Sequence, residues 1–369
     1  MVGGLNSRTR PYYHRMCKKV SSKNIESLPD ELLFDILLRL SVEDLYERAR
    51  LVCRRWSHII HSDAFVNTHL HHSTFGLVIS EIYGWRNRNL IYVSVTKPGR
   101  IEISELICKF RTAWSSCNGL VLELKSSLNI LNPATKQTFL LPPFPYECKF
   151  GFTGSSGIAY SAASMKYKVV QPHLLRGGSQ RMRLGILTVG VDNSWRHVEV
   201  EHLPHNVRQL CYHTPLITEG FIHWAAERDN EKVLTMNVET EIITETNPPL
   251  PEAYLSTSTH KYYLSTGWYL TLLVRREDLM WEVWEMKSAE SGEWRKQRHF
   301  QFACEHPEFI WPFGWVKYPE VLACHTGRAR TLILYNLHKH EIDSTKELPS
   351  LTDDYKAVPH RNTLVWLSP

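Results

Sequence analysis

The stretch that decides the architecture reads IESLPDELLFDILLRLSVEDLYERARLVCRRWSHIIHSDAFVNTHL and spans Ile25–Leu70. In its first half, apolar side chains recur three and four residues apart, at Leu32, Leu33, Ile36, Leu37 and Leu40. That spacing places them on one face of a helix. Proline is favourable at the first helical position because it has no N–H to leave unpaired there. The pattern therefore predicts an amphipathic helix whose first residue is Pro29.

A second helical run is predicted to begin at Ser41, whose hydroxyl can cap the backbone N–H groups of the first turn. Its apolar positions keep helical spacing, with room for one break, through Leu45, Ala49, Val52, Cys53, Trp56 and Ile60. Ser62 predicts the cap of a third short helix that ends in the sequence HLHHS. Three helices this short lie near the lower size limit for an independent fold. We therefore expect a partner or a neighbouring domain to cover part of the apolar stripe.

Taken together, these residues resemble the F-box, a helical motif that docks on the Skp-type adaptor of cullin-RING ubiquitin ligases. The matching residues are Leu28-Pro29, Glu31-Leu32-Leu33, Ile36-Leu37, Arg39-Leu40, Leu45, Arg50, Val52-Cys53, Trp56, Asp63 and Phe65. Ser41 stands where the family often carries proline, and a serine cap starts the helix equally well. The resemblance implies an adaptor-binding site made of Leu28, Pro29, Leu32, Leu33, Ile36, Leu37, Leu40, Leu45, Val52, Cys53 and Trp56.

Two other interpretations of this stretch are open from the residues alone. The apolar stripe can be core that packs against the rest of the chain, which is the usual role of such residues. A helix-turn-helix is allowed by four clustered arginines, Arg48, Arg50, Arg54 and Arg55. The Leu28-Pro29 pair favours docking over simple burial, and the wide apolar stripe beside the arginines disfavours an exposed recognition helix.

Composition limits the remaining classes of function. The 369 residues include 43 basic and 38 acidic side chains, interspersed, for a net charge of +5, so no nucleic-acid partner is expected. No apolar run approaches the roughly 20 residues of a membrane span, so no membrane partner is expected. Residues 1–24 carry six Lys or Arg and no acid, which predicts a disordered basic arm, with a nuclear-import signal as the alternative.

Signatures of chemistry are missing from the sequence. The eight cysteines form no Cys-x-x-Cys pair and no Asn-x-Ser/Thr acceptor occurs, which indicates a reducing compartment, the nucleus and/or the cytoplasm. The phosphate-loop, nucleophile-elbow, zincin and dinucleotide motifs are absent, so we predict no catalytic residue and no cofactor. His69, His71 and His72 have no companion Cys or carboxylate pattern, and no metal site is predicted there.

From Thr74 onward, short runs rich in Val, Ile, Leu, Tyr and Trp are broken by Gly, Asn and Pro, which predicts strands and tight turns. One pattern recurs clearly over Gly119–Pro143, Gly220–Pro249 and Glu320–Pro349, and more weakly over Arg183–Val200 and Gly267–Phe300. If Asn132, Gly190, Asn237, Glu285 and Asn336 are equivalent, the steps between them are 58, 47, 48 and 51 residues. A period near 50 residues is typical of four-stranded propeller blades. Most of the tryptophans are expected to pack between blades.

We predict a propeller of five to seven blades in which the last strand, Thr363–Leu367, completes a blade begun near residues 75–80 or 90–95. The region resembles the F-box-associated β domain that is common in plant F-box proteins. The resemblance rests on residues 114–120, 131–135, 157–160 and 167–170. The expected fold is α + β multidomain: an arm over 1–24, a three-helix F-box over 25–72 and an all-β propeller-like domain over 73–369.

The two resemblances together imply a substrate-recognition subunit of an SCF-type cullin-RING E3 ubiquitin ligase. Such a subunit binds the Skp-type adaptor through the F-box, binds a target protein through the β domain, and is not itself an enzyme. The target is not identified by the sequence. The alternatives are an adaptor-binding scaffold that delivers nothing for degradation, and a propeller that binds a glycan or another small ligand.

Overall fold

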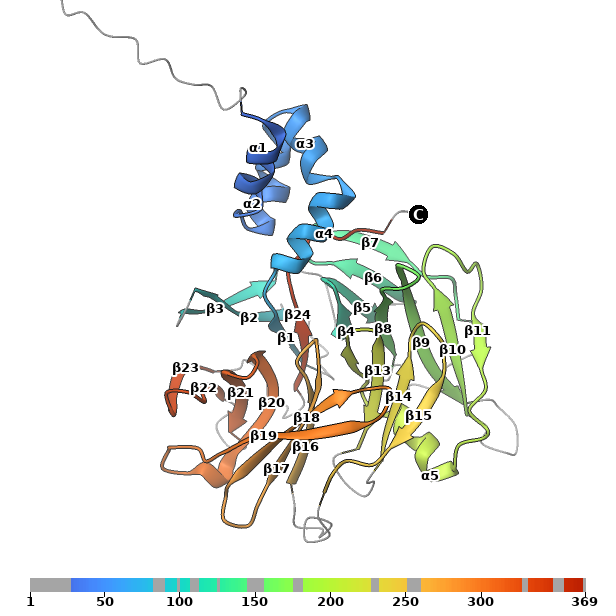
Figure 1. Ribbon diagram of the computed structural model, residues 1–369, viewed down its shortest axis with the longest axis vertical. Coiled ribbons are helices and arrows are strands. Elements are labelled where there is room, and N and C mark those ends of the chain that lie inside the picture. The colour runs from blue at the N-terminus through green and yellow to red at the C-terminus, as the bar shows by residue number, and fades with distance from the viewer. Residues whose placement is uncertain are drawn as a thin grey trace, which may run out of the picture.

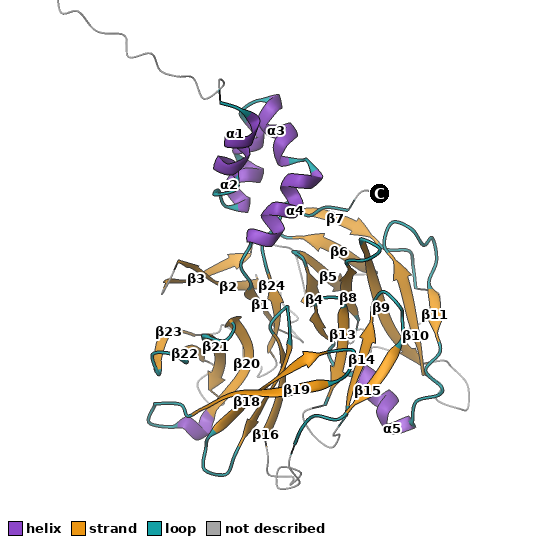
Figure 2. Ribbon diagram, in the orientation of Figure 1, coloured by secondary structure: helices purple, strands orange, loops and turns teal. Residues whose placement is uncertain are grey.

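The computed structural model describes residues 28–81, 90–97, 100–106, 113–124, 127–144, 156–174, 182–226, 232–250, 260–326, 331–347 and 355–367. Figure 1 shows a helical unit at one end of the molecule and a ring of small sheets that forms the rest. Figure 2 shows that most of the helix lies in this N-terminal unit. The predicted fold class, a small helical F-box region followed by an all-β propeller, is confirmed. The predicted arm over residues 1–24 lies outside the described residues.

Four α-helices and one 3-10 turn build the helical unit: α1 (Asp30–Leu37), α2 (Val42–Glu47), η2 (Ala49–Leu51), α3 (Arg54–Ile60) and α4 (Asp63–His72). The second predicted run is divided into α2, η2 and α3, with the break at Val52-Cys53, so the unit has four helices where three were predicted. Pro29 is the residue before α1 and not its first residue, although its carbonyl accepts a hydrogen bond from the Leu33 N–H.

Both predicted serine caps are present. The Ser41 hydroxyl accepts a hydrogen bond from the Asp44 N–H at 3.1 Å, and the Ser62 hydroxyl accepts one from the Phe65 N–H at 3.3 Å. Each bond satisfies a backbone donor that the helix itself leaves unpaired. The sequence thus marks the starts of α2 and α4 correctly.

Six four-stranded antiparallel sheets form the blades of the propeller. The first two blades contain β24 (Tyr355–His360), β1 (Gly76–Glu81), β2 (Leu90–Lys97) and β3 (Arg100–Leu106), then β4 (Ala113–Cys117), β5 (Leu120–Leu124), β6 (Leu128–Asn132) and β7 (Gln137–Leu140). The next two contain β8 (Gly157–Ser161), β9 (Lys166–Leu174), β10 (Met182–Thr188) and β11 (Arg196–Val198), then β12 (Leu216–Thr218), β13 (Phe221–Ala225), β14 (Val233–Asn237) and β15 (Ile243–Thr246). The last two contain β16 (His260–Ser265), β17 (Leu270–Arg275), β18 (Trp281–Ser288) and β19 (Glu293–Phe300), then β20 (Ile310–Lys317), β21 (Val321–Thr326), β22 (Thr331–Asn336) and β23 (Glu341–Glu347). Short helical turns, α5 (His205–Arg208) with η4 (Gln209–Tyr212) and η6 (Pro307–Phe309), precede two blades.

The innermost strands β4, β8, β12, β16, β20 and β24 contact one another around the hub in a closed ring. The ring is closed by β24, which pairs antiparallel with β1 from Gly76↔His360 to Glu81↔Tyr355. A C-terminal strand therefore completes the first blade, as predicted, but the strand was misplaced. The strand lies over Tyr355–His360, whereas Thr363–Leu367 is a non-strand tail that packs against the helical unit. The pairing covers the inner edge of β1, which would otherwise be left without a partner strand at the hub.

The repeat positions chosen in the sequence fall at or near the ends of third strands. Asn132, Asn237 and Asn336 end β6, β14 and β22, and each side-chain oxygen accepts hydrogen bonds from the backbone N–H groups two and three residues later. This arrangement is an Asx turn, which the asparagine side chain forms locally. It reverses the chain direction, so that the fourth strand pairs antiparallel with the third. The period of about 50 residues is therefore the spacing between the turns that follow the third strands of successive blades.

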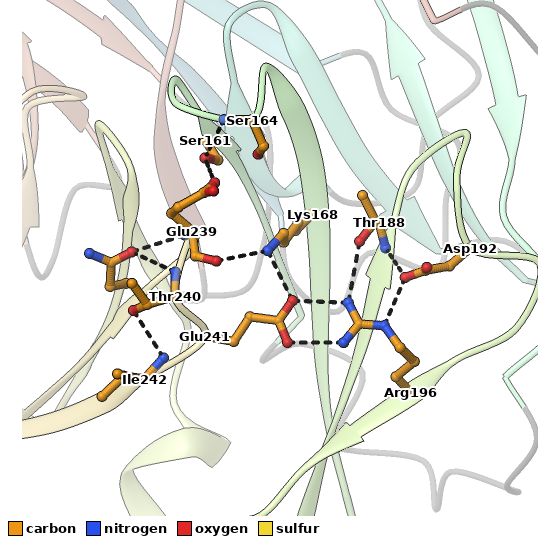
Figure 3. A network of polar contacts seen from close by, with 11 residues as sticks. Ser161, Ser164, Lys168, Thr188, Asp192, Arg196, Glu239, Thr240, Glu241 and Ile242 are labelled. Atoms are coloured by element: carbon orange, nitrogen blue, oxygen red, sulfur yellow. Dashed lines mark hydrogen bonds and ion pairs between the residues drawn. The ribbon is translucent and has the colours of Figure 1, made fainter.

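A polar network joins two neighbouring blades (Figure 3). The Arg196 guanidinium on β11 donates to both carboxylate oxygens of Glu241 at 2.9 and 3.0 Å, and Lys168 Nζ on β9 lies 2.9 Å from the same carboxylate. Glu241 belongs to the turn after β14, in the next blade. These ion pairs therefore link the β8–β11 blade to the β12–β15 blade and add to the apolar packing between them.

Apolar packing between blades includes several of the tryptophans. Trp224, Trp281 and Trp315 are among the largest fully buried side chains. Trp315 also donates its indole N–H to the Thr271 hydroxyl at 2.9 Å. These three confirm the expected packing role, whereas Trp284 and Trp311 are half-buried.

Candidate adaptor-binding surface

Three of the predicted adaptor residues are part of the core and not of a surface. Leu33, Leu37 and Leu45 have no exposed area, and they belong to one apolar cluster with Phe65. A buried side chain contributes to the stability of the unit but offers no area to a partner. In this structure these three leucines have a structural role, and their contact with the adaptor stays a prediction.

Five predicted adaptor residues are exposed on the helical unit: Pro29, Leu32, Ile36, Val52 and Cys53. Leu32, Ile36 and Val52 expose 52%, 42% and 60% of their surface, which is unusual for large apolar side chains. Leu51, which was not predicted, is exposed to 68% beside them in sequence. We call these six residues the exposed apolar surface. Its five predicted members are the part of the predicted site that is exposed in the structure.

The two segments of this surface are held together by an arginine. Arg55 on α3 lies 2.6 Å from the Asp30 carboxylate at the start of α1, and it also donates to the Leu28 carbonyl. Pro29 adjoins Asp30, and Cys53 is two residues before Arg55. The contact therefore brings the beginning of α1 next to the η2–α3 junction. Figure 1 shows α1 and α3 side by side at the end of the helical unit away from the propeller.

Leu28, Leu40 and Trp56 occupy an intermediate position, half-buried at the margins of the unit. Leu40 and Trp56 pack against the core cluster with part of their surface in solvent. Leu51 was not predicted, because in a continuous helix that begins at Ser41 its side chain would lie outside the apolar stripe. The 3-10 turn and the break at Val52-Cys53 turn this segment outward instead, and the sequence carries no local signal for that change of direction.

The opposite side of the helical unit is covered by the propeller. The core cluster runs without interruption from Leu33 and Phe65 to Leu122 and Ile130 of the β4–β7 blade. Ion pairing adds to this contact, because Lys136 Nζ lies 2.8 Å from the Glu47 carboxylate. The propeller therefore uses one face of the helical unit and leaves the exposed apolar surface on the other.

The C-terminal tail, residues 361–367, ties the two parts together. Arg361 donates to the Leu70 carbonyl at 3.1 Å and to the Asn118 side chain at 3.0 Å. Asn362 donates to Glu43 at 2.8 Å, and the Trp366 ring stacks on His61 with 4.8 Å between ring centroids. These contacts bridge helices α2, α3 and α4 to the hub.

The tail is itself seated on the β4–β7 blade. The Asn132 amide donates to the carbonyls of Thr363 and Val365 at 3.0 and 2.6 Å. Gly119, with φ +84°, lies so close to the Thr363 hydroxyl that a Cβ atom would stand 2.1 Å from it. A glycine is therefore required at this turn both by its backbone conformation and by the passage of the tail.

Metal sites and membrane spans were the other features considered from the sequence. Within it, no group of three His, Cys, Asp or Glu side chains is placed to hold a metal ion. His69 is buried with a pKa lowered by burial, and His71 and His72 are exposed at the end of α4. None of the described helices has the length and apolar composition of a membrane span.

Comparison with known proteins bears on both parts of the chain. The model of the F-box-like family matches residues 25–71, and the model of the F-box associated beta propeller domain matches residues 87–346. The chain belongs to the F-box proteins with an F-box-associated β-propeller domain. An Arabidopsis thaliana protein named as an F-box protein is 25% identical over 291 residues, which are 73% of this chain and 76% of that protein. A second one is 20% identical over 305 residues, 78% of this chain and 76% of that protein.

Solved structures that resemble this F-box protein are more distant. A chain of a nidogen–laminin complex aligns over 78% of this chain and 99% of its own length, with a TM-score of 0.46 and 11% identity. The β-propeller domain of Cps50 (Swd1) aligns over 74% of this chain and 88% of its own, with a TM-score of 0.36 and 10% identity. Membership of the family rests on the family models.

Proposed function

We propose that this F-box protein is the substrate-recognition subunit of an SCF-type ubiquitin ligase, and that the exposed apolar surface is where the Skp-type adaptor binds. The observation that carries the proposal is the split of the apolar stripe. One part of the stripe is buried in the core, namely Leu33, Leu37 and Leu45. The other part is exposed to solvent on the face that the propeller does not cover, namely Leu32, Ile36, Leu51 and Val52. Apolar side chains gathered on a soluble surface indicate a binding site.

The exposed apolar surface supplies several anchors for specific binding. Burying a large apolar side chain contributes roughly 1.5–3 kcal/mol, and several such anchors offset the cost of association. The cysteine and proline at its edge add area without charge. The Asp30–Arg55 pair between the two segments gives polar groups at the rim, where they favour orientation more than affinity.

In this role the chain performs no bond chemistry. It holds a target protein beside a ubiquitin-charged enzyme carried by other subunits, and thereby raises the effective concentration of a target lysine. That role needs a fixed geometry between the adaptor site and the target site. The apolar interface and the C-terminal tail between helices and propeller provide such a geometry.

The propeller is the part that we assign to the target protein, because the helical unit has one free face and the adaptor occupies it. A scaffold that binds the adaptor without delivering a target is the second candidate. The two differ in the fate of the protein that the propeller captures, which is degraded in the first case and stable in the second.

The proposal is tested by affinity capture of the full chain from cells, with and without proteasome inhibition, followed by mass spectrometry. We expect adaptor and cullin in both samples, and a further protein that accumulates on inhibition and whose half-life lengthens when the F-box protein is removed. Leu32→Asp with Ile36→Asp should remove adaptor and cullin but keep that further protein. Capture of the cullin unchanged by the double substitution would contradict the proposal, and an unchanged half-life would favour the scaffold.

A further inference from the structure

The exposed apolar side chains of the propeller gather at one end of its strands. Within the described part of the propeller, eight large apolar side chains are exposed: Leu140, Met165, Val191, Ile242, Trp268, Tyr269, Phe309 and Ile342. All except Leu140 and Phe309 lie in or directly beside a turn that follows the first or third strand of a blade. Single apolar residues scattered over a surface need no explanation, but this distribution is one-sided.

These turns lie at the end of the blades where the helical unit is attached. Neighbouring strands of a blade are antiparallel, so the turns after its first and third strands fall at the same end. Arg361, just after the innermost strand β24, donates to the Leu70 carbonyl of α4. Its guanidinium also contacts Asn118 of the β4–β5 turn and lies 5.0 Å from the Trp268 ring of the β16–β17 turn. We call the turns at this end the helix-side turns.

The helical unit and the six apolar side chains of the helix-side turns occupy different blades. The core cluster and the ion pair between Lys136 and Glu47 join the helical unit to the β4–β7 blade. The six side chains belong to the four blades from β8–β11 to β20–β23. The helical unit therefore does not account for their position.

The aromatic pair Trp268-Tyr269 is held in place by the rest of its turn. The Thr266 hydroxyl accepts hydrogen bonds from the Trp268 and Tyr269 N–H groups at 3.2 and 2.8 Å. The Trp268 ring also packs edge-on against Phe75, with 5.5 Å between ring centroids. Tryptophan and tyrosine are frequent anchors of protein interfaces, and side chains ordered in advance lose less entropy on binding.

Val191 and Ile242 belong to different blades and are linked by the polar network of Figure 3. Val191 directly precedes Asp192, and Ile242 directly follows Glu241. Arg196 donates to both of these carboxylates, at 3.1 and 2.9 Å. The network therefore fixes the β10–β11 turn relative to the β14–β15 turn, and it presents the two apolar side chains in a constant arrangement.

The helix-side turns are acidic, although the whole chain has a net charge of +5. All of them are described except residues 98–99, and these are an uncharged proline and glycine. The sequence therefore gives their total charge without any gap. They contain six acidic and two basic residues: Asp192, Glu219, Glu239, Glu241, Glu290, Glu320, Lys136 and Lys339.

Half of these carboxylates have no cationic partner. Ion pairs with lysine or arginine involve Asp192, Glu241 and Glu320, and both lysines are paired as well. The other three are exposed and form no ion pair within the described chain: Glu219, Glu239 and Glu290. One exposed base, Lys166 at the start of β9, offsets one of them. Exposed carboxylates without a partner favour a positively charged protein surface.

We propose that the target protein binds the helix-side turns of the blades from β8–β11 to β20–β23, through a basic patch that also carries apolar side chains. Its apolar side chains contact the exposed apolar residues, and its lysines or arginines face the carboxylates and the aromatic rings. The inference rests on the proposed function, to which it adds the surface and the chemistry of the target. A target in this position lies at the end of the blades where the helical unit is attached, and therefore near the adaptor.

Site-specific photocross-linking of the full chain in cells tests the surface. The photoreactive residue p-benzoylphenylalanine replaces Tyr269 or Ile242 in the helix-side turns, and Phe309 or Leu140 at the control positions. We expect the protein that accumulates on proteasome inhibition to be cross-linked from the first two positions and not from the control positions. Its cross-linked peptides should contain more Lys and Arg than Asp and Glu.

Reversal of charge tests the chemistry of the surface. Glu219→Lys with Glu290→Lys should lower recovery of the target at least about tenfold, because like charges then face each other, and should leave capture of adaptor and cullin unchanged. The matched control is Glu199→Lys with Glu201→Lys, at exposed positions after the end of β11, at the other end of the strands. It changes the net charge equally and should not lower recovery.

The outcomes separate the inference from the proposed function. Cross-links to the target from Phe309 or Leu140 alone, acidic cross-linked peptides, or an equal loss of target in the two charge variants would each overturn the inference and leave the proposed function intact. If the unaltered chain captured no adaptor, or no protein that accumulates on proteasome inhibition, the proposed function would fall and the inference with it.

Discussion

At the scale of single residues, asparagine side chains connect the repeat in the sequence to the shape of the molecule. Asn132 and Asn237 each cap the turn after a third strand, but Asn132 also donates to the Thr363 and Val365 carbonyls in the tail. Asn132→Ala should therefore destabilise the protein by about 1–3 kcal/mol, as expected when buried partners lose their hydrogen bonds. Denaturant unfolding gives the free energy, and hydrogen exchange at residues 363–365 should quicken.

Asn237→Ala is the matched control, because it removes the same kind of turn without touching the tail. Its cost should be smaller, and exchange at residues 363–365 should stay as in the unaltered chain. Equal effects of the two substitutions on the tail would show that Asn132 does not hold it.

The pairing of Glu241 gives a prediction about pH. Its hydrogen bond from Arg196, and then Lys168, holds the pKa of this carboxylate below its ordinary value of 4.5. A group whose pKa is lower in the folded state than in the unfolded state contributes its full stabilisation at a pH above the unfolded-state pKa. That contribution is lost as the pH falls through the folded-state pKa. Between pH 7 and pH 3, acid should therefore destabilise the unaltered chain more than it destabilises Glu241→Gln.

Urea midpoints at pH 7, 5, 4 and 3 would measure this difference. Glu290→Gln, at an exposed position in the turn between β18 and β19, serves as the control and should follow the unaltered chain at every pH. A Glu241→Gln variant that loses stability in parallel with the unaltered chain would contradict the inter-blade role of the carboxylate.

Residue patterns predicted some of these features and missed others for physical reasons. The caps at Ser41 and Ser62 and the Asx turns at Asn132, Asn237 and Asn336 are local, so the sequence reveals them directly. The burial of Leu33, Leu37 and Leu45 is not local. A helix with a wide apolar stripe packs part of it inward and leaves part outward, and its own sequence does not say where the boundary falls.

At the scale of elements, the C-terminal segment has two structural roles, pairing with β1 and packing on the helical core. The sequence could not assign these roles to separate parts of the segment. The apolar run Thr363–Leu367 is typical of a strand, yet the pairing with β1 is made by Tyr355–His360, and the run packs on the helical core instead. Its choice of partner depends on a surface assembled from α3, α4 and the β4–β7 blade. No pattern within the run could disclose that surface.

A truncation after His360 separates the two functions. It keeps β24 and therefore the closure of the propeller, but it removes the contacts of Arg361, Asn362 and Trp366 with the helices. We expect a folded propeller with a loosened helical unit, seen as faster proteolysis at residues 73–75 and a larger radius in small-angle X-ray scattering. The protein should remain able to bind the adaptor.

A truncation before Tyr355 provides the comparison, because it also removes β24 and leaves β1 unpaired at the hub. This shorter chain should lose cooperative unfolding or fail to fold. If the chain ending at His360 were as compact and as resistant to protease as the full chain, the tail would not be the link between the two parts.

At the scale of the whole molecule, a small helical unit stands on one side of a closed ring of blades. The exposed apolar surface lies on the helical unit, and the core of this unit packs on the β4–β7 blade. The sequence predicted this division into helices and propeller because helical and strand periodicities change at about Thr74. It left the number of blades between five and seven, since the innermost strands lie outside the recognisable repeats and were found only by their contacts.

The central claim is that the exposed apolar surface binds the Skp-type adaptor, and the dissociation constant of the purified full chain for that adaptor tests it most directly. Leu32→Asp with Ile36→Asp should raise the constant at least about 100-fold, because charges replace two anchors of the interface. Leu140→Asp with Ile342→Asp, at exposed apolar positions on β7 and β23, should leave it unchanged. Binding by the first variant as tight as by the unaltered chain, with its helices intact by circular dichroism, would contradict the account.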